Sequence, residues 1–319
     1  MRRRDFLRAA GAGVALAACR PLAGRPVIAA QGVVTAIDRA NRQVRAVLTD
    51  GQPIVAAYMN GRGRMPWPLA TATFERQGGW WLCTGPIGDR REILNDDFTQ
   101  VPTVVATVGG ALVACDTPWI AVSATPASTV SASTRSDQQG AANVAYVANA
   151  AGAQIVMRKG ALAVSVPTTG ALWLSARILL NTLGGVAGVN GIWVGLSDLA
   201  VIDANSDCAM VGLIWAATSN WYFATGSGSG TLAQTVSGVP AVADEWAWVD
   251  IVVAGGFSAA WVNGDGPYVS NDPALIPSGP FTPFFRTESS DILSRQGHVD
   301  ALTLTGVGEA NDPAAYRVG

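Results

Sequence analysis

The chain has 319 residues, of which 49% are hydrophobic and only 14% are charged. This composition excludes intrinsic disorder as the default state, and the length is sufficient for two domains with separate cores. Four widely spaced cysteines, with no CxxC or CxxxC pair, give no support for a zinc site, and we expect neither a metal nor a cofactor.

The net charge of −2 conceals two halves of opposite sign. Residues 1–92 contain 14 arginines and 6 acids, a balance of +8, whereas residues 93–319 contain 7 basic groups and 17 acids, a balance of −10. Such a division indicates two domains. The arginines are scattered, which favours a solvated docking face over a nucleic-acid surface, and no nucleic-acid partner is expected.

Residues 1–30 precede the first expected strand and have two interpretations. The segment Arg3–Arg8 resembles the twin-arginine export motif, and Leu16–Cys19 resembles a lipobox, which implies lipidation at Cys19. The apolar run Ala9–Ala18 is too short for a spanning helix. The other interpretation is a retained N-terminal arm that docks on a neighbouring protein.

Residues 31–92 have the pattern of a small β-barrel. Turn signals such as Asp50-Gly51 and Gly78-Gly79 separate five short segments rich in strand-forming residues, namely 33–37, 43–48, 54–58, 71–75 and 80–83. Five short strands cannot bury a good core as a flat sheet, whereas closure removes the edges. We predict an OB-like or SH3-like barrel, with the domain boundary within the polar residues 85–97.

Residues 93–319 alternate short strands with turns, and no segment keeps a period of 3.6 over more than ten residues. The Ala-, Ser- and Thr-rich stretch 121–153 is either a long exposed loop or a set of weak edge strands. Strands are expected at 104–114, 154–157, 162–166, 171–180, 192–196, 210–216, 221–224, 232–236, 246–253, 258–262, 281–285 and 298–304. The predicted fold class is all-β, with a small N-terminal OB-like barrel (31–92) and a concanavalin-like two-sheet jelly-roll sandwich (93–319).

The order of these segments resembles that of virion proteins of tailed bacteriophages. Gly32–Asp38, Trp67-Pro68 and Gly79–Gly85 resemble their small OB-like modules. Asn95–Phe98, Ala176–Leu179, Val194–Leu196, Trp246–Ile251, Ala260–Gly264 and Val299–Leu302 resemble concanavalin-like or laminin-G-like jelly rolls, which recur in phage minor tail and capsid decoration proteins. The resemblance implies a structural protein located in the virion, with other virion proteins as partners, a symmetric homo-oligomeric assembly and possible attachment to host surface glycans.

Catalytic motifs are missing from the sequence. The single histidine, His298, has no serine in a G-x-S-x-G turn to activate, and a structural or surface position is expected for it. No strand contains acids at the alternate positions that glycoside hydrolysis would use on such a sandwich. We therefore predict that the protein is not an enzyme.

Two pairs of residues are the candidates for ligand binding. Trp221 and Tyr222 precede the Gly-rich turn 226–230 and are expected to be an exposed aromatic pair. Asn263 and Asp265, with Asn271 and Asp272 nearby, have oxygen atoms that calcium could use, although turn formation explains them equally well.

The other tryptophans are expected to be core residues for the most part. Trp246 and Trp248 must share one face of their strand, because side chains alternate with period two.

Three functions compete. The first is a non-enzymatic virion component that docks through its N-terminal region and displays a jelly roll able to bind host glycans. The second is an exported bacterial lipoprotein, anchored through Cys19, with a carbohydrate-binding sandwich. A glycan-cleaving enzyme ranks last because paired carboxylates are missing.

Overall fold

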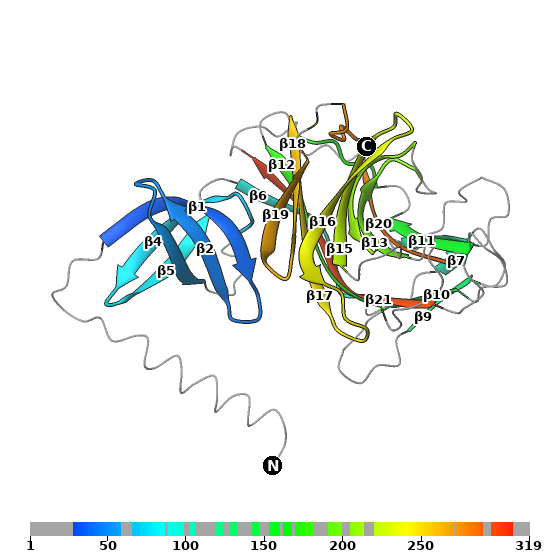
Figure 1. Cartoon of the computed structure of the whole chain (residues 1–319), viewed down its shortest axis with the longest axis horizontal. Helices are drawn as coiled ribbons and strands as arrows, with labels where there is room; N and C mark the ends of the chain where they lie inside the picture. Colours follow the sequence, from blue (N-terminus) through cyan, green and yellow to red (C-terminus); the bar gives the residue numbers. More distant parts are fainter. Residues whose placement is uncertain are drawn as a thin grey trace, which may run out of the picture.

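The computed structural model describes residues 28–58, 66–86, 89–98, 103–105, 119–123, 128–132, 142–146, 153–159, 162–167, 170–180, 191–199, 205–213, 220–270, 272, 274–289 and 295–308. Across these residues the regular elements are all β-strands, arranged as a small barrel and a two-sheet sandwich (Figure 1). The predicted fold class is confirmed. No helix within these ranges is long and apolar enough to cross a membrane.

The N-terminal barrel consists of β1 (Ile28–Asp38), β2 (Gln43–Leu48), β3 (Pro53–Tyr58), β4 (Thr71–Gln77) and β5 (Trp80–Pro86). The strands close in the order β1-β2-β3-β5-β4, with β3 parallel to β5 and the other pairs antiparallel. Buried and exposed residues alternate strictly in β2, as expected for a barrel strand whose inward side chains fill the interior.

Sheet B of the sandwich has the order β19-β18-β17-β12-β21-β10-β9, and β6 also pairs with β21. Its strands are β6 (Asp89–Asp96), β9 (Ser128–Ala132), β10 (Ala142–Tyr146), β12 (Ala171–Leu180), β17 (Ala247–Ala254), β18 (Phe257–Val262), β19 (Asp265–Ser270) and β21 (Arg295–Gly308).

Sheet C has the order β16-β15-β14-β13-β20-β11-β8-β7. Its strands are β7 (Thr103–Val105), β8 (Trp119–Ser123), β11 (Ala153–Lys159), β13 (Gly191–Ser197), β14 (Asp207–Gly212), β15 (Asn220–Ser227), β16 (Leu232–Pro240) and β20 (Thr282–Ser289). The inward faces of the two sheets form the main core, with buried residues such as Leu174, Val249 and Leu304 from sheet B and Val194, Val211 and Phe285 from sheet C.

The structure differs from the sequence expectations in three segments. The predicted boundary region 85–97 contains β6, which pairs with β21, so the expected division between residues 92 and 93 lies inside a strand. β19 was not expected, because the whole of Asn263–Gly266 has the composition of a turn, whereas the strand begins within it at Asp265. Residues 162–166 form an isolated bridge at Val164 and no strand. In the described parts of 121–153 the chain forms short strands, as the second expectation for that stretch proposed.

The barrel packs against the outer face of sheet B (Figure 1). Its buried residues form one hydrophobic cluster with Trp173, Val252, Ala259, Trp261 and Val307, which project outward from β12, β17, β18 and β21. For this reason β12 is buried on both faces over most of its length. The positions of the two domains are therefore fixed by a shared core.

Candidate functional site

The barrel covers part of the outer face of sheet B, and tryptophan side chains lie on the same face next to it. The residues of β17 alternate between the sandwich core and this outer face. Trp248 and Asp250 point outward together with Trp246, which directly precedes the strand, so the prediction that Trp246 and Trp248 share a face is confirmed. Both indoles are half-buried, because the barrel covers only part of the face.

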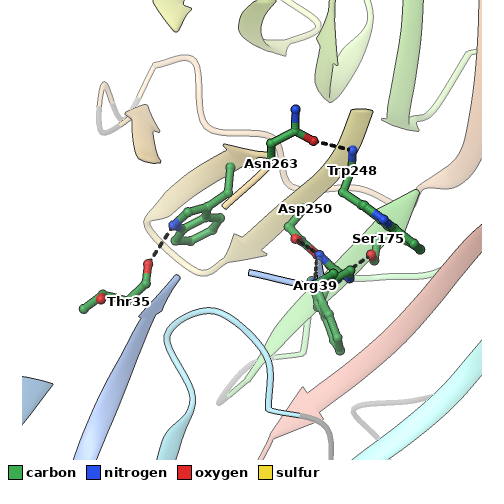
Figure 2. Close-up of polar contacts among 8 residues, drawn as sticks. Thr35, Arg39, Ser175, Trp248, Asp250 and Asn263 are labelled. Atoms are coloured by element: carbon green, nitrogen blue, oxygen red, sulfur yellow. Dashed lines mark hydrogen bonds and ion pairs between the residues drawn. The ribbon is translucent and has the colours of Figure 1, made fainter. Parts of the chain in front are cut away.

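Arg39 joins the barrel to this face through an ion pair that is almost fully buried (Figure 2). It lies in the turn after β1, and its two terminal nitrogens donate to the two oxygens of Asp250 at 2.5 and 2.7 Å. One of these nitrogens also donates to Ser175 Oγ at 2.8 Å. This bidentate geometry holds the turn in one orientation on sheet B.

Asp250 has a third donor, because Trp173 Nε1 donates to its Oδ1 at 2.9 Å. The guanidinium of Arg39 also lies 4.6 Å from the ring centroid of Trp248. Burial by itself would lower the pKa of Arg39, but the charge and hydrogen bonds of Asp250 outweigh it and hold that pKa above its ordinary value. The ion pair is thus compensated in the way a buried charge requires.

A second contact fixes the other side of the junction. Thr35 lies at a β-bulge in β1, where the register with β2 shifts between Val34 and Ala36. The irregular pairing leaves the Thr35 carbonyl free for a different donor, and Trp261 Nε1 of β18 donates to it at 2.7 Å (Figure 2).

Beyond the junction, Arg177 and Trp246 form an accessible cluster. Arg177 donates to Asp300 at 2.6 Å, and its guanidinium lies 4.8 Å from the ring centroid of Trp246. Asp300 reaches this face because a bulge in β21 places it between two register pairs with β12. His298 meets the edge of the Trp246 ring at 6.4 Å between centroids. The side chains of Arg177 and Asp300 remain 30% and 15% exposed.

We call Trp246, Trp248, Arg177 and Asp300 the tryptophan face. This surface suits a polar ligand with apolar sides: the partly exposed indole rings offer stacking surfaces, and the charged groups beside them offer hydrogen bonds. Trp246 and Trp248, two residues apart on an extended chain, are separated by about 7 Å. Sequence reasoning placed the two tryptophans together but missed Arg177 and Asp300, because only the β12–β21 pairing brings them there.

The predicted residues Trp221 and Tyr222 lie on opposite faces of β15. Trp221 is only 3% exposed and packs in the sandwich core, so its expected exposure is wrong. Tyr222 is half-buried on the outer face of sheet C, beside the cluster that contains Trp193. A ligand-binding role for Tyr222 stays a prediction.

Asn263 and Asp265 belong to the β18–β19 hairpin in sheet B and are not brought together with Tyr222. Asn263 Oδ1 accepts from the Trp248 backbone at 2.9 Å, which places it next to the tryptophan face (Figure 2). Asp265 accepts from the hydroxyl of Tyr268. Among the described residues no group of three or more His, Cys, Asp or Glu side chains could hold a metal. Asn271 and Cys19 lie outside the described residues.

Comparison with known proteins gives similar folds only. No protein-family model matches the chain, and no curated protein matches its sequence. Peanut lectin with a 9mer peptide is similar at a TM-score of 0.46 and 10% identity, covering 69% of this chain and 98% of that chain. Lectin II from Ulex europaeus has a TM-score of 0.44 and 12% identity, covering 68% of this chain and 99% of that one.

An enzyme is also among the similar structures. An alginate lyase of polysaccharide lyase family 7 has a TM-score of 0.38 and 17% identity, covering 54% of this chain and 80% of that one. With scores and identities this low, none of these likenesses carries an argument about function.

Proposed function

We propose that this protein is a non-enzymatic glycan-binding protein, in which the barrel fixes the sandwich in place and the tryptophan face holds the sugar. The observation behind this proposal is the pair of partly exposed indoles, Trp246 and Trp248, each with a guanidinium over its ring. Asp250 and Asp300, the carboxylates beside the two indoles, accept hydrogen bonds from Arg39 and Arg177. They are therefore committed to fixing the arginines rather than to proton transfer.

We further propose that the protein is a component of a phage virion, a minor tail or capsid decoration protein. The resemblance of its segments to those of phage virion proteins supports this role. The rigid junction between the barrel and sheet B also supports it, because a binding domain displayed on a particle has to be held in a fixed orientation. Multiple copies in a symmetric particle would turn weak sugar contacts into strong attachment.

A glycan array followed by calorimetric titration tests the sugar site. Truncation in the Trp246→Ala variant removes one stacking surface, so we expect affinity for the bound glycan to fall about tenfold or more. Trp80→Ala is the matched control, because Trp80 is an exposed indole on the barrel, and it should bind like the original protein. Equal binding by both variants, or no binding of any glycan by the original protein, would contradict the proposal.

The virion role and the lipoprotein alternative are separated by mass spectrometry and electron microscopy. An intact N-terminus and density for the protein in purified particles support the virion role. An acylated Cys19 would instead establish the alternative, a membrane-anchored exported protein whose sandwich binds carbohydrate, as the Leu16–Cys19 segment suggests.

A further inference from the structure

The ion pair between Arg177 and Asp300 presents both donors and an acceptor at the tryptophan face. It consists of one hydrogen bond, from Nη1 of Arg177 to Oδ2 of Asp300 at 2.6 Å. Among the described residues neither side chain makes a second hydrogen bond, and the two are 30% and 15% exposed. A ligand stacked on Trp246 therefore meets N–H groups of the guanidinium and an acceptor oxygen of the carboxylate.

This combination of groups suits hydroxyls better than anions. A sugar hydroxyl both donates and accepts, so neighbouring hydroxyls of one ring can bond to Arg177 and to Asp300 at the same time. A carboxylate or sulfate group can only accept. It could bond to Arg177, but it would bring a second negative charge next to the carboxylate of Asp300, and like charges at such short range repel.

The guanidinium over the other indole offers no accessible charge. Arg39, over the ring of Trp248, gives two hydrogen bonds to Asp250 and one to Ser175. The side chains of Arg39 and Asp250 are only 9% and 2% exposed. The positive charge of Arg39 is thus balanced inside the protein, and it gives an anionic ligand little to bind.

The surroundings of Trp246 add negative charge. Asp244 and Glu245 directly precede it in the chain, and both are exposed. Residues 93–319 as a whole contain 7 basic groups and 17 acids, a balance of −10. Charges within about 10 Å interact at 0.1 M salt, so an anionic ligand is repelled here and an uncharged one is not.

We propose that the tryptophan face selects uncharged glycans over glycans with uronate or sulfate groups, and that Asp300 is the residue that determines this selectivity. The inference rests on the proposed glycan site and adds the charge class of its ligand. The indole of Trp246 stacks on the apolar side of either kind of sugar ring, so the discrimination comes from the carboxylate beside it.

A glycan array that contains neutral, uronate and sulfated glycans is the first test, read with the original protein and with Trp246→Ala. We expect the glycans whose binding depends on Trp246 to be uncharged. Anionic glycans as the strongest Trp246-dependent ligands would overturn the selectivity and leave the glycan site standing. No binding of any glycan, or binding that does not depend on Trp246, would overturn the glycan site and this inference with it.

The Asp300→Asn variant tests the assigned residue. It keeps the size and an acceptor oxygen but removes the charge. Calorimetric titration compares the best-bound neutral glycan with a derivative in which a C6 hydroxyl is oxidised to a carboxylate. We expect the original protein to prefer the neutral form at least about tenfold, and Asp300→Asn to lose most of that preference.

Asp50→Asn is the matched control, because it makes the same change in net charge at an exposed turn of the barrel. Its preference should equal that of the original protein. A preference that Asp300→Asn leaves unchanged, or that both variants reduce equally, contradicts the role of Asp300. Equal weakening of both ligands by Asp300→Asn would show a purely structural role and would also contradict it.

A measurement on the original protein needs no variant. Salt at about 500 mM NaCl screens exposed charges, so the preference for the neutral form should shrink relative to that at about 50 mM. A preference that does not change with salt would be steric rather than electrostatic and would overturn the proposal.

Discussion

Cys208 lies in β14 on the outer face of sheet C, among Met210, Ala224 and Phe284, and is fully buried. Burial first, and then the charges of Asp207 and Asp198, raises the pKa of its thiol from 9.0 to about 12. Cys83, in the barrel, is likewise a buried free thiol with a raised pKa. At neutral pH both side chains are therefore small apolar residues rather than nucleophiles.

The shifted pKa of Cys208 predicts a loss of stability in alkaline solution. The unfolded thiol ionises near pH 9 and the folded one near pH 12, so the stabilising difference is complete below pH 9 and disappears as pH rises toward 12. The expected slope from this group is about 1.4 kcal/mol per pH unit. Urea unfolding from pH 8 to 11 measures it, and Cys208→Ala should lack this part of the decline. Parallel curves for the two proteins would contradict the prediction.

Arg39 shows how one side chain depends on a distant partner. Its ion pair with Asp250 joins residues that are 211 positions apart in the chain. No local pattern around residue 39 distinguishes it from the other arginines of the basic half, so sequence reasoning assigned the whole group to a solvated face. The partner becomes visible only when the barrel is placed on sheet B.

At the scale of elements, the β18–β19 hairpin lies directly against β1 of the barrel. Asn263 and Gly264 both have positive φ, 51° and 78°, which is the conformation of a two-residue Asn-Gly turn. An added Cβ on Gly264 would lie 2.6 Å from the carbonyl oxygen of Ile37 in β1. Glycine is thus required at this position both for its backbone angle and for the space beside it.

This double requirement predicts unequal costs for two glycine substitutions. Gly264→Ala should destabilise the protein by more than the about 1–2 kcal/mol that a left-handed backbone costs an alanine, because a rigid backbone oxygen stands in the way. Gly78→Ala is the matched control, since Gly78 has a φ of 67° and open space around it. Chemical unfolding of both variants compares them, and equal losses would contradict the prediction.

The strands that sequence reasoning predicted best are those with clear alternation and clear turns. The range 171–180 coincides with β12, and the predicted strand 258–262 ends at the same residue as β18. Trp221 was misplaced because alternation defines two faces without saying which one is covered. β6 was missed because its polar residues resemble a linker, and only pairing with β21 makes them a strand.

At the scale of the whole molecule, the barrel and the sandwich share buried surface. Interfaces between domains are commonly polar and permit relative motion, but here the barrel core is continuous with Trp173, Val252 and Trp261 of sheet B. The Arg39–Asp250 ion pair lies within this apolar contact. Rigid coupling of the two parts is the expected consequence.

This coupling predicts a single cooperative unfolding transition for the original protein in calorimetry, with agreeing calorimetric and van't Hoff enthalpies. Arg39→Ala leaves the carboxylate of Asp250 buried without its cation, at a cost of about 3–5 kcal/mol, and should lower Tm and split the transition into two. Arg45→Ala, which removes an exposed arginine of the same barrel, should leave one transition. Two transitions in the original protein would contradict the prediction.

The sequence predicted two domains of opposite charge and their fold class, but it did not predict that the two domains share a hydrophobic core. Hydrophobic patterning defines which residues are buried, and it cannot tell whether Trp173 and Trp261 are covered by their own domain or by another. Only part of the tryptophan face could be predicted from the sequence. The period-two alternation of a strand places Trp246 and Trp248 on one face, whereas Arg177 and Asp300 belong to other strands whose pairing the sequence does not reveal.

The sandwich depends on the N-terminal part of the chain, because β6 belongs to its sheet B and the barrel covers the outward indoles of that sheet. A sandwich excised at residue 93 would lose the first half of β6 and expose Trp173 and Trp261 to water. Such a fragment would expose an apolar patch and would be prone to self-association. Replacement of the sandwich by another jelly roll would therefore require a barrel that covers the same outward indoles.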